Sequence, residues 1–273
     1  MSRPGSPAAG AAIPHLPGRL RLRVFLRLLV LQASWNHQRM QNLGLLVSLM
    51  PWLSDRPRDA ERDRLFCRRY YEFFNTNPYL AGYVVGGLLR LEQEREGQGG
   101  LPRGQAQVFR DSLARALASL GDQLFWLGLR PATLLLAAVL ALLAGSAAPW
   151  PLAVLAVVVV GFQFAWRWRS LGRGYVAGYD IVELLGDRRW HRAITLGKRA
   201  TLFLGAALAG LLLREAATGS VRTGAPAAVA VAALAACMAV PVAARRRWAG
   251  EFIVLTAAAA AVVLAFALGT EGS

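Results

Sequence analysis

Cysteine, histidine and acidic side chains are all scarce in this chain of 273 residues. Its two cysteines, Cys67 and Cys237, stand far apart in very different surroundings, so they predict neither a disulfide framework nor a metal site. Charged residues make up 17% of the chain, whereas 55% of the residues are apolar. This composition excludes an intrinsically disordered chain and argues against an ordinary soluble enzyme.

Among the few charged residues, one sign dominates. Lys and Arg number 31 against 16 Asp and Glu, which gives a formal net charge of +15. Such an excess is typical of nucleic-acid-binding proteins, but the long apolar runs indicate a membrane protein whose basic residues contact anionic lipid. We therefore expect a lipid bilayer, and no nucleic acid, as a partner. A cleaved signal peptide is not predicted, because Arg27 lies inside the N-terminal apolar stretch and Gln32 follows it.

The second half of the chain contains apolar runs about long enough to cross a membrane as helices. Five spans are predicted, at 132–148, 152–166, 200–213, 225–244 and 252–268. Pro149-Trp150-Pro151 stands between the first two and predicts a turn that makes them a hairpin. Basic residues fill the links after the second and the fourth span, which predicts a cytoplasmic N-terminal half and an outside C-terminus.

The first half is predicted to be helical, but cytoplasmic or interfacial. Helical patterns cover 21–53, 59–74 and 79–96, and a Gly-rich break follows at 97–104. The predicted organisation is a disordered tail (1–18), a helical region that holds the polar motifs (19–130), a transmembrane region (131–269) and a short tail (270–273). The fold class is thus an all-α integral membrane protein, with an amphipathic helical half followed by about five transmembrane helices.

Two polar blocks interrupt the helical pattern of the first half. The first is Ser34-Trp35-Asn36-His37-Gln38-Arg39-Met40-Gln41, and the second is Tyr71-Glu72-Phe73-Phe74-Asn75-Thr76-Asn77-Pro78-Tyr79. Amides and carboxylates bond vicinal hydroxyls while aromatic rings cover the C–H face of a sugar, so these side chains are typical of carbohydrate binding. Helix capping and hydrogen bonding between helices stay open as alternatives.

A third polar block, 120–131, directly precedes the first span. Asp122 and Arg130 are eight residues apart, about two turns of an α-helix, which would place both on one face. The alternative is that Trp126 and Arg130 anchor the helix at the membrane boundary, with Asp122 as an N-cap. No single motif in the three blocks carries a reaction.

Taken together, four separated motifs resemble one known family. They are Trp35-Asn36-x-x-Arg39-Met40-Gln41-x-x-Gly44, Glu72-Phe73-Phe74-Asn75-Thr76-x-Pro78, Gly121-Asp122-x-x-Phe125-Trp126-x-x-x-Arg130-Pro131 and Gly174-Tyr175-x-x-Gly178-x-Asp180-Ile181. Their order and spacing are similar to those of the IID subunit of the mannose/fructose/sorbose-type sugar phosphotransferase system. The chain is identified as a divergent member of this family, from about Val24 to the C-terminus.

The resemblance implies a non-catalytic subunit of the bacterial inner membrane. Such a subunit forms a hexose pathway with a IIC subunit, in a trimer of IIC–IID heterodimers, while separate IIA and IIB phosphocarriers phosphorylate the sugar. It implies no catalytic residue, metal or cofactor in this chain. The motif positions that it places around the sugar path, together with the neighbouring amide, are Trp35, Asn36, Glu72, Asn75, Thr76, Asn77, Gly121 and Asp122. Arg39, Trp126 and Arg130 take structural or anchoring roles.

Departures from the family pattern keep two alternatives open. Family members carry Met-Gly-Pro-Leu-Ala-Gly before the Gly-Asp pair, whereas residues 114–119 here read Ala-Arg-Ala-Leu-Ala-Ser, with Arg115, Ala116 and Ser119 in place of Gly and Pro. Residues 111–120 are therefore predicted to form a plain helix. The alternatives are a regulatory or signalling remnant that no longer transports, and a lone membrane protein that organises anionic lipid. The sugar is not predicted, because hexose epimers differ by one hydroxyl.

Overall fold

The computed structural model describes residues 15–96 and 100–217, a part of the chain built from helices and the turns between them. The predicted spans 225–244 and 252–268, the tail 270–273 and most of the tail 1–18 lie outside the described residues. The described residues form two compact units. One contains 15–123 and Val160–Trp190, and the other contains Leu124–Val159 and 191–217.

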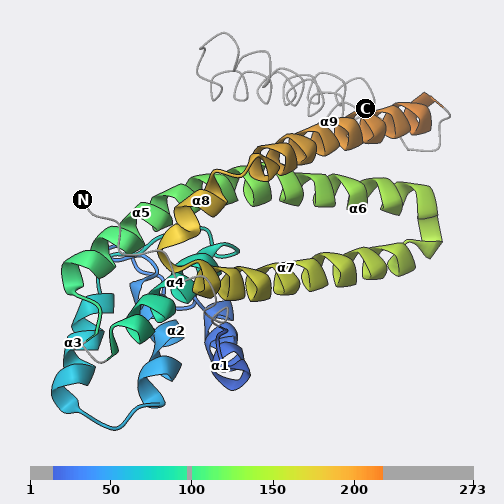
Figure 1. The fold of residues 1–273 in the computed structure, drawn as a ribbon. Helices are drawn as coiled ribbons and strands as arrows, with labels where there is room; N and C mark the ends of the chain where they lie inside the picture. Colours follow the sequence, from blue (N-terminus) through green and yellow to red (C-terminus); the bar gives the residue numbers. More distant parts are fainter. Residues whose placement is uncertain (1–14, 97–99, 218–273) are drawn as a thin grey trace. The chain divides into compact units, whose positions relative to one another are not determined.

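The first unit contains the short helices of the N-terminal half and the C-terminal part of a longer one (Figure 1). Its helices are α1 (Gly18–Leu29), α2 (Asn42–Ser54), α3 (Ala60–Tyr70), α4 (Ala81–Glu94), α5 (Arg103–Gly121), the end of α7 (Pro149–Ala177), η4 (Gly178–Asp180) and α8 (Ile181–Leu185). The predicted helix 21–53 is therefore two helices, separated by the first polar block. Asp59 caps α3, because its carboxylate accepts hydrogen bonds at 3.1 Å from the N–H groups of Glu61 and Arg62.

Helix α4 is the buried centre of this unit, and glycines bring it against α7. Gly82 and Gly86 are four residues apart and meet the backbone of α7 around Ser170 and Gly174. A Cβ on Gly86 would lie 2.2 Å from the carbonyl oxygen of Leu171. Small residues spaced in this way let two helix backbones approach closely. The close approach fixes α4, and with it the turn that leads into its N-terminus.

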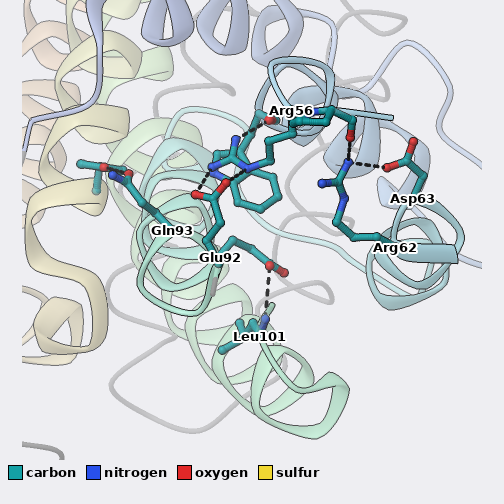
Figure 2. Close-up of polar contacts among 10 residues, drawn as sticks. Arg56, Arg62, Asp63, Glu92, Gln93 and Leu101 are labelled. Carbon is teal, nitrogen blue, oxygen red and sulfur yellow. Dashed lines mark hydrogen bonds and ion pairs between the residues drawn. The ribbon is translucent and has the colours of Figure 1, made fainter. Parts of the chain in front are cut away.

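The C-terminal end of α4 carries a buried carboxylate. Glu92 is 1% exposed, and its Oε1 accepts hydrogen bonds from the Arg69 guanidinium and the Tyr70 hydroxyl. Its Oε2 accepts the N–H of Leu101 at 3.2 Å (Figure 2). Burial raises the pKa of Tyr70, and the charge of Glu92 raises it further, so the phenol keeps the proton that it donates. This cluster connects α3, α4 and the chain that enters α5.

Three stretches of the described helices are long and apolar enough to cross a membrane. They are Arg103–Ala147, Pro149–Asp180 and Glu183–Leu212, and they correspond to the first three predicted spans. The second unit contains most of the π-helix η2 (Asp122–Leu129), α6 (Arg130–Ala144), η3 (Gly145–Ala147), the beginning of α7 and most of α9 (Arg188–Ala217).

The turn between the first two spans lies earlier than the sequence predicted. Helix α6 ends at Ala144, and Gly145 follows with a φ of +53°, which glycine adopts without the strain that a side chain would cause. Pro149 is already the first residue of α7, and Pro151 lies in its first turn, where a missing N–H removes no intrahelical hydrogen bond. The prediction that Pro149-Trp150-Pro151 forms the turn was wrong.

Candidate functional site

The first polar block folds into a tight loop that pairs with the segment after α3. Asn36 and Met40 exchange backbone hydrogen bonds of 3.1 and 2.9 Å, and Met40 has a φ of +55°, which is uncommon for a residue with a side chain. Phe74 donates its N–H to the carbonyl oxygen of Arg39 at 3.3 Å and accepts the N–H of Gln41 at 2.8 Å. The two polar blocks predicted from the sequence are therefore neighbours in the structure.

Beyond α3, residues 71–76 are not helical, and their side chains alternate between two faces as in a strand. Phe74 and Thr76 are buried, at 1% and 4% exposure. The side chains that reach the surface are those of Tyr71, Phe73 and Asn75. The predicted helix 59–74 therefore ends at Tyr70, because the chain that follows pairs with the loop before α2. Asn75 is the amide that this alternation presents to solvent.

Asn77 joins the second polar block to the third. It is 2% exposed, and its Nδ2 donates to Asp122 Oδ1 at 3.2 Å, while its Oδ1 accepts the N–H of Tyr79 at 3.1 Å. Gly121 makes this arrangement possible, because a Cβ there would lie 2.3 Å from both Cβ and Cγ of Asn77. The predicted residues Asn77, Gly121 and Asp122 thus form one contact group, with the residue Asp122 at its exposed edge.

Glu72 is directed toward α5. Arg103 donates to its Oε1 at 2.7 Å, and the buried guanidinium of Arg110 donates to its Oε2 at 3.2 Å. Burial raises the pKa of Glu72, but the hydrogen bonds and charges of the two arginines outweigh this and hold it below its usual value. The carboxylate of Glu72 therefore stays ionised and holds the inward face of residues 71–76 against α5.

Acidification should remove the stability that the ion pairs of Glu72 contribute to the folded protein. Because its pKa is lower in the folded protein than the ordinary value of 4.5, its ion pairs contribute stability above about pH 4.5 and lose it as the pH falls through the lowered pKa. We expect the melting midpoint of the wild type to exceed that of Glu72→Gln at pH 7 and the difference to shrink below about pH 4.5. Thermal unfolding of the detergent-solubilised protein measures this. Glu61→Gln, at an exposed site on α3, is the control, and a constant difference for Glu72→Gln would contradict the expectation.

Trp35 and Arg39 lie on the outer side of the same loop. Trp35 is 47% exposed and contacts the His37 ring edge to face, with the ring centroids 5.0 Å apart. Arg39 donates to the carbonyl oxygen of Tyr71 at 3.0 Å, and its guanidinium stands 5.0 Å from the centroid of the Tyr71 ring. Arg39 thereby ties the first polar block to the second.

The third polar block enters a π-helix. Helix α5 runs unbroken to Gly121, as predicted for 111–120, and η2 follows at once. Asp122 is therefore not an N-cap. The eight residues to Arg130 do not span two α-helical turns either, because the i to i+5 bonding of a π-helix is wider. The N-cap prediction and the predicted spacing of two α-helical turns were wrong, whereas the anchoring role of Trp126 and Arg130 stays a prediction. In the second unit, the Arg130 guanidinium stands 4.9 Å from the centroid of the Trp126 ring.

Two further sets of residues support the site, and the sequence interpretation did not assign them. Gln41 is 2% exposed and Asn42 is 0% exposed, and the Asn42 Oδ1 accepts from Asn36 Nδ2 at 3.2 Å. Gln41 belongs to the first polar block, so its position in that block was an available signal. Arg103 and Arg110 are seven residues apart, two turns of one helix face, which is the spacing that could have revealed a shared partner.

Chemically, the group combines rigid support with exposed polar and aromatic side chains. Asn36, Thr76 and Asn77 are held by hydrogen bonds, whereas Trp35, Asn75 and Asp122 reach the surface. An amide offers two donors and an acceptor, and a carboxylate that already accepts one bond keeps further acceptor sites. Such a set can bind the hydroxyl groups of a polar, uncharged ligand.

Comparison with known proteins gives consistent matches. The family model described as the PTS system mannose/fructose/sorbose family IID component matches residues 16–234. Over 164 residues the chain is 34% identical to the PTS system mannose-specific EIID component of Escherichia coli (strain K12), covering 60% of this chain and 57% of that protein. It is 30% identical to the PTS system sorbose-specific EIID component of Klebsiella pneumoniae, covering 60% and 58%. The match thus spans less than two thirds of these relatives.

A solved structure is also similar. It is the cryoEM structure of the mannose transporter ManYZ in complex with microcin E492, with a TM-score of 0.53 and 31% sequence identity. The match covers 71% of this chain and 70% of that chain.

Proposed function

Because the chain belongs to the mannose/fructose/sorbose family of IID components of the sugar phosphotransferase system, we propose that it forms, with a IIC-type subunit, the membrane pathway for a hexose of the mannose, fructose and sorbose class. IID components are non-catalytic membrane subunits, so the phosphoryl transfer belongs to separate IIA and IIB carriers. The complex is a hetero-oligomer, a trimer of IIC–IID pairs, in the bacterial inner membrane.

One observation carries the proposal. Three polar blocks that are far apart in the sequence form a connected hydrogen-bonded group, and that group presents Asn75 and Asp122 at its surface. The hydrogen bonds of the buried members restrict their movement, which supports a fixed geometry for the exposed members. A fixed amide and a fixed carboxylate are what discrimination among sugar hydroxyls requires. The basic links between the predicted spans support the proposed sidedness, with the N-terminal half on the cytoplasmic side and the C-terminus outside.

Alanine at either exposed polar residue should impair transport. We expect Asn75→Ala and Asp122→Ala each to raise the half-saturating sugar concentration about tenfold, because each removes hydrogen bonds to hydroxyls. The measurement is uptake and phosphorylation of radiolabelled mannose, fructose and sorbose, each in turn. The cells used express the chain with its neighbouring IIA, IIB and IIC subunits and lack other transporters of these sugars.

Gln105→Ala is the matched control, since it removes an exposed amide from α5. Immunoblots of the membrane fraction show whether each variant reaches the membrane at the wild-type level. Wild-type uptake that stays unchanged in both Asn75→Ala and Asp122→Ala would contradict the site assignment.

A second candidate function is a regulatory or signalling remnant that keeps the fold but does not transport. The unbroken helix α5 favours it, because residues 114–119 lack the glycines and the proline of the family pattern. Absence of uptake by the wild type with a complete set of partners would support this second function. Sugar-dependent co-purification with a partner in the absence of uptake would support it further.

A further inference from the structure

Gln41 occupies the point where the backbone pairing between the two polar blocks ends. Its own N–H donates to the carbonyl oxygen of Phe74 at 2.8 Å, after which the main chain turns away into α2. Its side-chain amide then continues the pairing two residues further on. Nε2 donates to the carbonyl oxygen of Thr76 at 3.0 Å, and Oε1 accepts the N–H of Thr76 at 3.2 Å. The side chain therefore acts as a substitute for a peptide group.

These contacts bracket Asn75. The residue before it, Phe74, is bonded through both its N–H and its carbonyl oxygen to the backbone of Arg39 and Gln41. The residue after it, Thr76, is bonded through both backbone groups to the Gln41 side chain. With both neighbours bonded, the backbone of Asn75 is restricted, and its Cα–Cβ bond leaves the segment in one direction.

The same anchor extends to Asp122. Thr76 is also fixed through its hydroxyl, which donates to the carbonyl oxygen of Ala114 in α5 at 3.0 Å. The next residue is Asn77, whose amide donates to Asp122. A shift of Thr76 would therefore move the donor of the bond that orients the Asp122 carboxylate. Both exposed polar groups of the proposed sugar site depend on the position of one residue, and Gln41 holds that residue.

We propose that Gln41 is a positioning residue for sugar binding, which sets the orientation of Asn75 directly and of Asp122 through Thr76 and Asn77. This inference rests on the proposed function. The role needs one donor and one acceptor at the end of a side chain of this length, in a buried position. Glutamine supplies that combination, whereas glutamate cannot donate when ionised and asparagine is one methylene shorter.

The test uses Gln41→Ala, Gln41→Glu and the double variant Gln41→Ala/Asn75→Ala in the complete complex, with the sugar uptake assay above. We expect each single variant to raise the half-saturating concentration about tenfold, with the maximal rate per membrane-inserted complex changed less than twofold. The double variant should raise the half-saturating concentration by less than the product of the two single effects, because the part of the Gln41 effect that acts through Asn75 is already lost in Asn75→Ala.

Ser48→Ala is the matched control. It removes a buried hydroxyl of α2 that donates to the carbonyl oxygen of Gly44 within the same helix. We expect it to leave the half-saturating concentration unchanged. A fall in maximal rate and membrane level for Gln41→Ala, with an unchanged half-saturating concentration, would overturn the inference in favour of a merely structural role. A double variant whose half-saturating concentration rises by the full product of the two single effects would overturn the inference as well.

Hydrogen exchange separates this inference from the proposed function. In the purified complex, the N–H groups of Thr76 and Tyr79 should exchange at least tenfold faster in Gln41→Ala than in the wild type, and at the wild-type rate in Ser48→Ala. Unchanged exchange in Gln41→Ala would overturn the positioning role whether or not the protein transports sugar. Absence of uptake by the wild type, with the expected exchange pattern, would contradict the proposed function and confirm the positioning geometry.

Discussion

Glu92→Gln is expected to destabilise the folded protein by about 3–5 kcal/mol, because it leaves the charge of Arg69 buried without a partner. Arg69 is 9% exposed and Glu92 is 1% exposed, so solvent screens neither charge effectively. The glutamine keeps the shape of the side chain, but its single oxygen can accept from Tyr70 or from the N–H of Leu101, and not from both. The loss therefore reports the missing charge and one lost hydrogen bond rather than a cavity.

The melting midpoint of the detergent-solubilised protein measures this effect, and a fall of about 10 °C is expected for a chain of this size. Glu94→Gln is the matched control on the same helix. It breaks an ion pair with Arg90 four residues earlier in which Glu94 is 46% exposed, and such pairs contribute about 0.3–0.5 kcal/mol. Equal midpoints for Glu92→Gln and Glu94→Gln would contradict the prediction.

The double variant Arg69→Met/Glu92→Gln tests the cause. It removes both charges and keeps the acceptor for Tyr70. Replacing a buried ion pair by uncharged side chains of similar volume is often neutral. We therefore expect the double variant to melt closer to the wild type than Glu92→Gln does. A double variant that melts below Glu92→Gln would show that the hydrogen bonds, and not the unpaired charge, dominate.

Gly121→Ala is expected to reduce sugar uptake more than tenfold. The added Cβ would lie 2.3 Å from two carbon atoms of Asn77, a distance that real side chains do not tolerate. Asn77 cannot move aside easily, because it is buried and its side chain is bonded to Asp122 and to the backbone of Tyr79. Relief of the overlap must break the bond to Asp122 or shift α5, at about 1–3 kcal/mol of stability.

Gly104→Ala is the control for this substitution. Gly104 lies in the same helix, and a Cβ there would meet no atom within 4 Å. Alanine is favoured over glycine in helices by about 1 kcal/mol at most, so this variant should melt at or slightly above the wild-type temperature and transport normally. Uptake by Gly121→Ala at the level of Gly104→Ala would show that the Asn77–Asp122 contact is not needed.

The sequence predicted more of the architecture than of the site. Apolar runs predicted three helical stretches that are long and apolar enough to cross a membrane, because this property depends on length and composition alone. The position of the first turn was not predictable from Pro149 and Pro151, since proline is tolerated both in turns and in the first turn of a helix. In the structure the turn begins at Gly145, which follows the end of α6 and has a positive φ.

For the site, residue types indicated which blocks carry the polar groups, and their order along the chain resembled one family. The blocks alone did not show which side chains are exposed. Glu72 and Asn75 come from the same motif, yet one is paired with two arginines of α5 and the other reaches solvent. That difference follows from the alternation of residues 71–76, which depends on their pairing with the loop before α2.

What the sequence by itself determined is therefore the all-helical class of the described part of the chain, its three candidate membrane spans and the polar blocks, because these depend on composition and local periodicity. Only the tertiary structure decided that Gln41 holds Thr76, that Asn77 holds Asp122 and that Gly121 must lack a side chain. The physical reason is that these contacts join residues up to 45 positions apart, and their geometry depends on the packing of α2, α4 and α5 around them.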